Sequence, residues 1–118
     1  MDRFKWVNDT HGHDTGDRVL RMVAQTLASN SRPMDVVGRW GGEEFVVGLA
    51  QVDEREILRC AHRYRMLVEN SYVEGLQDSL QVSVSIGASL VREDETLDEA
   101  LRRVDELMYE SKSSGRNR

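Results

Sequence analysis

A pair of glycines between two short apolar runs constrains this chain more than any other feature. The pair is Gly41-Gly42, and the runs are residues 36–40 before it and 45–47 after it. A two-residue hairpin turn of the primed type needs positive φ at both central positions, which glycine adopts without steric cost. The pattern therefore predicts a β-hairpin with both glycines at the turn, a first strand from about residue 36 and a second over 43–49.

Two carboxylates, Glu43 and Glu44, directly follow the glycines. Two acids at a hairpin tip repel each other unless a cation or hydrogen-bond donors offset their charge. A divalent metal ion together with a phosphate-bearing substrate is the natural candidate. In isolation such a segment is more often a solvated turn with two surface glutamates, so the rest of the chain decides between the two interpretations.

Length and charge bound the class of protein. The 118 residues suffice for one domain with a single core. A net charge of −5 argues against a broad nucleic-acid-binding surface, which needs clustered Lys and Arg. Cys60 is the single cysteine, so no intramolecular disulfide can form. Without an apolar run of about 18 residues or a signal peptide, we expect a cytoplasmic chain, or the cytoplasmic part of a membrane-anchored protein.

Hydrophobic periodicity predicts three helices and one more strand. The helices are expected over 15–29, over 53–70 with Asp53 as its N-cap, and from Thr96 or Leu97 onward. Apolar residues at every second position over 80–90 predict a strand with one buried face. The element order αββαβα suggests an α+β sandwich in which helices cover one face of an antiparallel sheet.

Four other segments accompany the GGEEF hairpin in a recognisable order and spacing: DRFKWVND over 2–9, HGHDTGD over 11–17, VSIG over 84–87 and KSSGRN over 112–117. Together they resemble the GGDEF domain of diguanylate cyclases, in its GGEEF variant. The resemblance covers nearly the whole chain. It implies a ferredoxin-like fold, similar to the palm of nucleotidyl cyclases, with GGEEF on the hairpin.

The resemblance also implies that segments are missing at both ends. The family's βαββαβ core begins with a central strand that ends in D-x-D, and it closes with a last strand. This sequence begins at Met1-Asp2, so residues 1–118 are expected to be a single GGDEF domain that is incomplete at both ends. A sheet without its central strand should be poorly stable unless another chain supplies one. Asp2 lies on the same face as the absent aspartate and is a weak candidate to replace it.

The resemblance implies condensation of two GTP into cyclic di-GMP and pyrophosphate by a homodimer, with Mg²⁺ or Mn²⁺ as the cofactor. Glu43 and Glu44 are the expected catalytic and metal-binding acids. Glu44 has an alternative role as a surface ion-pair partner. Positioning and charge neutralisation carry most of the barrier in such a reaction.

The remaining site residues follow from the same resemblance. Gly41 and Gly42 let the backbone approach the nucleotide. Asn8 and Asp17 are expected to recognise guanine, although Asn8 also suits a turn and Asp17 suits a helix N-terminus. The phosphate contacts are expected to be Phe4, Lys5, Lys112 and Arg116, of which the last two also suit a solvated tail. His11 and His13 lack a third metal ligand and are interpreted as part of a loop.

A second expected site lies upstream of the hairpin. Arg32 and Asp35 form an R-x-x-D motif whose distance from the GGEEF turn matches an inhibitory cyclic di-GMP site of the family, with Arg63 as a supporting residue or a solvated charge. Two functions remain open at this point: a cyclase with product inhibition, or an inactive module that senses cyclic di-GMP. A purine cyclase is disfavoured. A regulatory domain is expected upstream in the parent protein.

Overall fold

The structure is a computed structural model that describes residues 1–71, 73 and 80–116. It confirms the α+β class but not the full order of elements. The helices and strands, in chain order, are α1 (Phe4–His11), α2 (His13–Ser29), β1 (Val36–Gly41), β2 (Glu44–Gly48), α3 (Glu54–Glu69) and α4 (Leu97–Ser113). Among the described residues, no helix has the length and apolar character needed to cross a membrane.

The sequence did not predict helix α1. It begins after Arg3, whose φ is +54° and whose side chain does not cap the helix. Val7 is the one buried residue in its eight positions. A helix with one apolar anchor and no capping residue lacks both patterns by which a sequence indicates a helix.

The other helices begin at or near the predicted residues, and Asp53 caps α3 as predicted. Helix α2 begins two residues earlier than expected, after Gly12. The Asp53 carboxylate accepts a hydrogen bond of 2.8 Å from the Glu56 amide at the start of α3. Thr96 Oγ1 accepts one of 3.2 Å from the Glu99 amide at the start of α4. Such caps satisfy backbone donors that have no partner within the helix.

The hairpin forms as predicted, but its turn lies one residue later. Gly41 ends β1 and pairs with Glu44, so Gly42 and Glu43 occupy the turn. Only Gly42 of the two glycines has positive φ, at +48°, and the prediction of positive φ at both was wrong. The register shifts between Arg39 and Gly41, which is a bulge, and one extra residue in β1 displaces the turn.

Residues 80–90 are extended but do not form the predicted strand. The predicted burial of every second side chain holds at the start of this segment, where Leu80, Val82 and Val84 are buried. A cavity of about 540 Å³, lined by residues 84–89 and by β2, lies between the two segments. Paired strands lie about 4.8 Å apart, so this space prevents a hydrogen-bonded ladder. Within the described residues, β1 and β2 therefore make up a two-stranded sheet.

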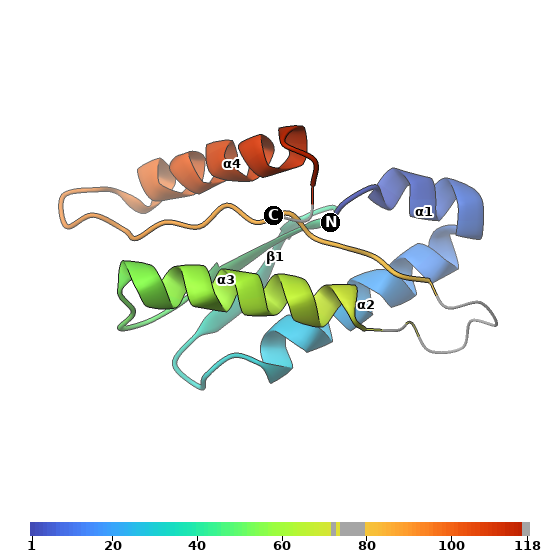
Figure 1. Cartoon of the computed structure of the whole chain (residues 1–118), viewed down its shortest axis with the longest axis horizontal. Helices are drawn as coiled ribbons and strands as arrows, with labels where there is room; N and C mark the ends of the chain where they lie inside the picture. The colour runs from blue at the N-terminus through green and yellow to red at the C-terminus, as the bar shows by residue number, and fades with distance from the viewer. Residues whose placement is uncertain (72, 74–79, 117–118) are drawn as a thin grey trace.

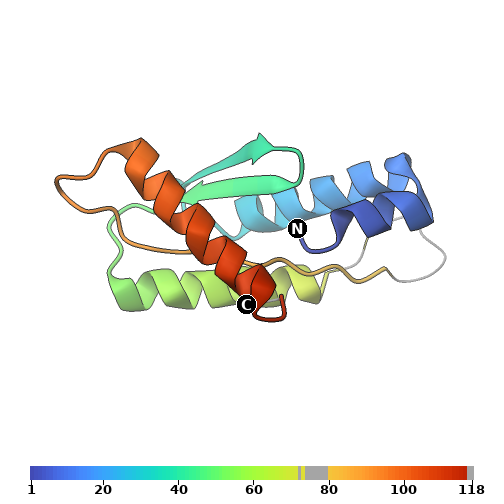
Figure 2. The same ribbon diagram turned by 90° about the horizontal axis from the view of Figure 1, so that it is seen from above.

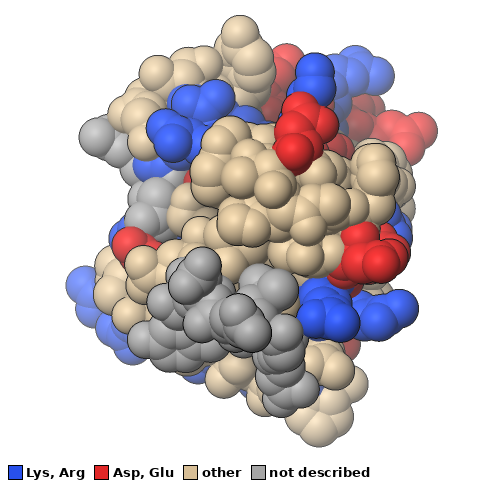
Figure 3. Space-filling model, turned by 90° about the vertical axis from the view of Figure 1, so that its right-hand side faces the viewer, with Lys and Arg blue, Asp and Glu red and all other residues tan. Residues whose placement is uncertain are grey.

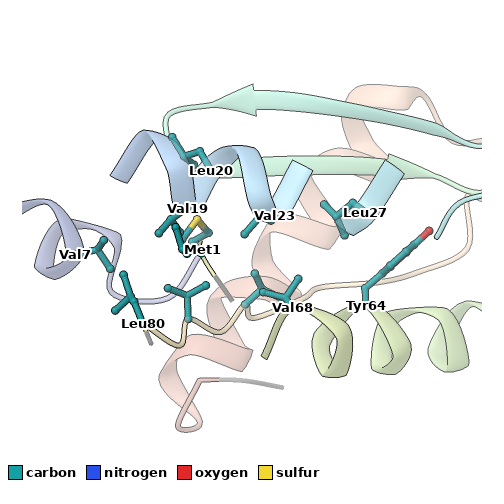
Figure 4. Packing of buried hydrophobic residues seen from close by; sticks show 12 residues of the cluster. Met1, Val7, Val19, Leu20, Val23, Leu27, Tyr64, Val68 and Leu80 are labelled. Carbon is teal, nitrogen blue, oxygen red and sulfur yellow. The ribbon is translucent and has the colours of Figure 1, made fainter. Parts of the chain in front are cut away.

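Helices lie on both sides of the layer formed by the hairpin and residues 80–90. Helix α4 covers one face, and α2 and α3 lie on the other (Figures 1 and 2). The expectation that helices cover one face only was therefore wrong. The main core lies on the α2 and α3 side (Figure 4), where the most deeply buried side chains are Val7, Val19, Val23 and Val68.

Helix α4 packs directly against the backbone at Gly87. A Cβ atom added at Gly87 would lie 2.1 Å from the Val104 carbonyl oxygen and 2.4 Å from the Met108 nitrogen. Ser111 Oγ also donates a hydrogen bond of 3.1 Å to the Ile86 carbonyl. Gly87 thus sets how closely α4, with its C-terminal Lys112, approaches the rest of the molecule.

We predict that Gly87→Ala lowers the free energy of unfolding by about 1–3 kcal/mol, because the new methyl group pushes α4 away. Urea unfolding measures this. Gly48→Ala is the matched control, since its Cβ would lie 3.9 Å from the nearest side-chain atom, an ordinary contact distance. Equal unfolding midpoints for the two variants would contradict the close packing at Gly87.

Candidate functional site

The hairpin tip is an open backbone surface held by an arginine. The Arg39 guanidinium donates two hydrogen bonds to the Gly42 carbonyl, of 2.8 Å from Nε and 2.5 Å from Nη2. A Cβ at Gly41 or at Gly42 would meet nothing within 4 Å, so a ligand can approach the backbone there. The sequence did not single out Arg39, and its only indication was the three-residue spacing to Gly42 across the turn.

Charged groups from both ends of the chain converge beside this tip. The Met1 ammonium donates a hydrogen bond of 3.0 Å to the Glu43 carbonyl. Burial lowers the pKa of this ammonium below its usual range, and the charge of Lys112 lowers it further. Three carboxylates act in the opposite direction, those of Glu43, Asp2 and Glu44. Both hairpin acids and Lys112 therefore lie within electrostatic range of the Met1 ammonium.

Asp2 is part of the framework beside these groups. Its Oδ2 accepts a hydrogen bond of 2.7 Å from Ser83 Oγ, and its Oδ1 accepts one of 2.7 Å from Ser85 Oγ. The side chain is buried. Because both carboxylate oxygens are engaged by serines, the structure gives no support for Asp2 as a replacement metal ligand.

The hairpin acids are the side chains that could hold the expected metal ion. Among the described residues, no three His, Cys, Asp or Glu side chains converge into a group that could hold a metal ion. Mg²⁺ in proteins usually binds one or two carboxylates plus the phosphates of a substrate, and keeps several waters. Glu43 and Glu44, both half-buried at the hairpin, meet that smaller requirement.

The expected phosphate contacts come from two helix ends. Phe4 and Lys5 form the first turn of α1, where backbone N–H groups have no partner within the helix. Such N–H groups, with the helix dipole, favour anions. Lys112 lies half-buried in the last turn of α4, and Arg116 is exposed just beyond it. The charge effect of Lys112 at Met1 places the end of α4 near the start of the chain.

The expected guanine-binding residues lie on two adjacent helices, Asn8 on α1 and Asp17 on α2. Asn8 packs against Gly16, the residue before Asp17. The Asn8 Oδ1 atom is buried and has no hydrogen-bond partner. Asp17 is exposed and lines a groove of about 400 Å³ that also reaches Arg39 and Phe45 of the hairpin. The groove connects Asp17 with the hairpin.

The two histidines lie at the junction of α1 and α2. His11 ends α1 and His13 begins α2, with Gly12 between them. The His11 ring makes an edge contact with Trp6, the ring centroids being 5.6 Å apart. They are helix-end residues rather than loop residues, and nothing in the described structure brings a third ligand to them.

Arg32 and Asp35 form an ion pair with each other at the base of the hairpin. Arg32 Nη2 lies 3.2 Å from Asp35 Oδ1, and the Arg32 amide donates to Oδ2 at 2.8 Å. Asp35 Oδ1 also accepts from the Ala50 amide at 3.3 Å, and the Arg32 guanidinium donates to the Ala50 carbonyl. The Asp35 side chain is 3% exposed and that of Arg32 44%. The motif therefore ties the start of β1 to the end of β2.

Arg63 joins the same region from α3. Its Nη2 donates a hydrogen bond of 2.9 Å to the Asn30 carbonyl, and its guanidinium lies 5.8 Å from the centroid of the Tyr64 ring. Asn30 and Asp17 lie at opposite ends of α2, roughly 20 Å apart at 1.5 Å per residue. The R-x-x-D region is therefore separate from the groove at Asp17.

Opposite charges are mixed on the face beside α1. Figure 3 shows Lys and Arg side chains interspersed with Asp and Glu around an uncharged central area. Such an arrangement produces no strong field of one sign on that face.

A family model decides what kind of domain this is. The model described as "Diguanylate cyclase, GGDEF domain" matches residues 1–118. The chain belongs to the GGDEF family. Among curated relatives, the diguanylate cyclase DgcZ of Escherichia coli K12 is 42% identical over 118 residues, with all of this chain and 40% of the relative covered. The response regulator PleD of Caulobacter vibrioides is 47% identical over 120 residues, with coverages of 99% and 26%.

Solved GGDEF structures share the fold. The diguanylate cyclase SiaD of Pseudomonas aeruginosa, in complex with its activator SiaC, is 40% identical with a TM-score of 0.93, covering 98% of this chain and 45% of that one. The GGDEF domain of DgcB from Caulobacter crescentus, in complex with c-di-GMP, is 31% identical with a TM-score of 0.92, covering 99% and 70%. This GGDEF chain spans less than half the length of the curated relatives named above.

The ion pair at the hairpin base predicts a dependence of stability on pH. Hydrogen bonds from the Arg32 side chain and then its backbone hold the pKa of Asp35 below its usual 3.8. A carboxylate with a lowered folded-state pKa stabilises the fold above its unfolded pKa and loses that contribution as the pH falls through the folded value. We therefore expect Asp35→Asn to flatten the loss of stability below about pH 4.

Urea unfolding between pH 3 and pH 7 measures this effect. The matched control is Glu106→Gln, which removes an exposed carboxylate from α4. It should leave most of the acid-dependent slope intact. The same slope in both variants would show that Asp35 does not contribute through its pairing with Arg32.

Proposed function

We propose that this chain acts as a diguanylate cyclase domain, which condenses two GTP molecules into cyclic di-GMP and pyrophosphate. The observation that carries the proposal is the position of Glu43 and Glu44 at an open Gly-Gly hairpin tip, with Lys112 in electrostatic range of the Met1 ammonium that bonds to this tip. Carboxylates and a cation at a surface that admits a ligand suit a polyphosphate substrate and its metal ion. Membership of the GGDEF family supports the same reaction.

Each group has a role in placing GTP. Asp17 accepts hydrogen bonds from the N1–H and N2–H₂ groups of guanine, and Asn8 contacts the base beside it. Adenine offers no such pair of donors, so it would leave Asp17 without a partner. The N-terminal amides of α1, at Phe4 and Lys5, bind phosphate oxygens together with Lys112 and Arg116.

The chemistry is the formation of two phosphodiester bonds: the 3′-hydroxyl oxygen of each GTP attacks the α-phosphorus of the other, releases its proton to solvent and displaces one pyrophosphate. Glu43 and Glu44 hold Mg²⁺ or Mn²⁺, which when bound lowers the pKa of the hydroxyl and neutralises the leaving group. Lys112 and Arg116 offset the charge of the phosphates. Because the product is symmetric and uses two identical substrates, two copies of the domain face each other, each holding one GTP.

Cyclic di-GMP also binds at Arg32, Asp35 and Arg63 in this proposal and inhibits the domain. The complex of DgcB with c-di-GMP supports binding of that ligand by the fold. Here the carboxylate of Asp35 is already occupied by Arg32 and by the Ala50 amide. The ligand must therefore displace Arg32 from Asp35 or contact the exposed face of the guanidinium, which is well suited to phosphate or to stacking on guanine.

A second candidate function is a module that binds cyclic di-GMP without catalysis. The position of Asp2 favours it, because its carboxylate is held by Ser83 and Ser85 and leaves the two hairpin acids to bind metal. In the parent protein, an upstream regulatory domain controls the activity of this domain. It does so by controlling the pairing of two copies.

We predict that Glu43→Ala lowers cyclic di-GMP synthesis by about a hundredfold or more while leaving the fold intact, since it removes a metal-binding carboxylate. The assay is incubation with GTP and Mg²⁺ followed by chromatography. Glu106→Ala, an exposed change on α4, is the control. Unchanged turnover in Glu43→Ala would exclude it as a metal ligand.

If the unmodified chain forms no product, the same assay is run on a version extended at its N-terminus by an apolar strand that ends in aspartate. Synthesis by the extended version supports the cyclase and shows that the added aspartate is required. No synthesis by either version, together with binding of cyclic di-GMP, selects the sensor function.

We also predict that Arg32→Ala relieves inhibition by cyclic di-GMP without abolishing synthesis, because the inhibitory ligand loses its main cation. Titration with cyclic di-GMP measures this in whichever version is active. Arg59→Ala, an exposed change on α3, should be inhibited like the unmodified protein. Equal inhibition of the Arg32 and Arg59 variants would remove the second site.

A further inference from the structure

Among the described glycines, Gly16 leaves the least room for a side chain next to a polar group, the amide of Asn8. A Cβ atom at this position would lie 1.9 Å from Asn8 Oδ1 and 3.0 Å from Asn8 Cγ. It would also lie 3.3 Å from Cζ of Phe4. Contacts below 3.0 Å do not occur with real Cβ atoms, so any other residue at position 16 must move the amide of Asn8.

Glycine is otherwise unfavourable at this position. Gly16 lies inside α2, four residues into the helix, and its φ is negative. Alanine is a better residue in a helix interior, because glycine loses more backbone entropy on folding. No turn or positive φ requires glycine here, so the space it leaves for Asn8 is its distinctive contribution.

This contact fixes which end of the Asn8 amide is accessible. The Oδ1 atom is buried and has no hydrogen-bond partner. The other polar atom of the side chain, Nδ2, makes no hydrogen bond within the described residues and is not among their buried unpartnered atoms. The side chain therefore presents a donor, while the carboxylate of Asp17, the residue after Gly16, presents an acceptor.

We propose that Gly16 is a positioning residue for nucleotide binding, which holds the amide of Asn8 beside Asp17 with its nitrogen outward. The inference rests on the proposed function, because the ligand that these two side chains contact is the guanine base. A donor and an acceptor held together on neighbouring helices suit a base edge that carries both kinds of group. A displaced amide would leave polar atoms of the base without hydrogen-bond partners, so the position of the amide contributes to specificity.

The test is a double-mutant cycle with Gly16→Ala, Asn8→Ala and the double variant. The first readout is calorimetric affinity for the α,β-methylene analogue of GTP with Mg²⁺, and the second is the urea unfolding midpoint without ligand. Gly48→Ala is the control, because it is a glycine at the far end of the hairpin with only ordinary contacts. Such cycles isolate the interaction between two residues that touch.

We expect Gly16→Ala to weaken binding by about tenfold, the effect of losing one hydrogen bond. In the Asn8→Ala background the same change should not weaken binding further. Its effect on the unfolding midpoint should change sign, from a decrease with Asn8 present to an increase with Asn8 absent, because the clash is gone and alanine favours the helix.

Two failures are distinguishable. Absence of analogue binding by the unmodified chain contradicts the proposed function and, with it, the nucleotide role of Gly16. Normal analogue binding that Gly16→Ala leaves unchanged overturns the inference alone. A midpoint that falls equally in both backgrounds also overturns it, because the cost would then not come from Asn8.

Discussion

The contacts of Met1 and Asp2 hold together parts of the molecule that otherwise lie apart. The Met1 ammonium bonds to the Glu43 carbonyl, and the Asp2 amide donates to the Ser83 carbonyl at 3.0 Å. The Asp2 carboxylate adds two serine hydroxyls on the same side. A cavity of about 540 Å³ separates the hairpin from residues 84–89 beyond these contacts. Met1 and Asp2 therefore connect the hairpin tip to the extended segment on which α4 packs.

Two glycines set the distances at which candidate binding groups sit. Gly87 allows α4 to contact the extended segment, and α4 ends at Lys112. Gly16 allows α2 to contact Asn8 on α1. In both cases the missing side chain lets two elements approach closely, and one of the two carries a candidate binding group. Because protein interiors are densely packed, a single methyl group added at either glycine would displace its neighbours. Such glycines therefore influence the position of candidate binding groups on other residues.

The R-x-x-D region has a structural role at the hairpin base, and in the proposed function it also binds a ligand. Arg32, Asp35 and the backbone of Ala50 close the base of the hairpin whose tip carries Glu43 and Glu44. A ligand that displaces Arg32 exchanges an internal ion pair for an external one. In the proposed function, the energy of ligand binding would be coupled to the order of the hairpin, which would connect this region physically to the acids at the hairpin tip.

The sequence by itself determined the features that depend on local chemistry. The Gly-Gly hairpin, the cap at Asp53, the start of the last helix at Thr96 or Leu97, and the α+β class follow from φ preferences, hydrogen bonding of short polar side chains and apolar periodicity. The family follows from motifs whose order is readable along the chain. These patterns involve residues that are close in sequence, so no knowledge of the fold is needed to recognise them.

Only the tertiary structure decided the rest. A single bulge near Trp40 moved the turn by one residue. Residues 80–90 form no ladder with β2 because a cavity lies between residues 84–89 and that strand, although Ser83 accepts a backbone hydrogen bond from Asp2. Helix α1, with one buried side chain, exists through its packing on α2. The pairing of Arg32 with Asp35 and the contact of Gly16 with Asn8 depend on side-chain geometry, which spacing does not encode. The sequence therefore identifies the candidate functional side chains, and the packing of distant segments determines which of these side chains contact one another.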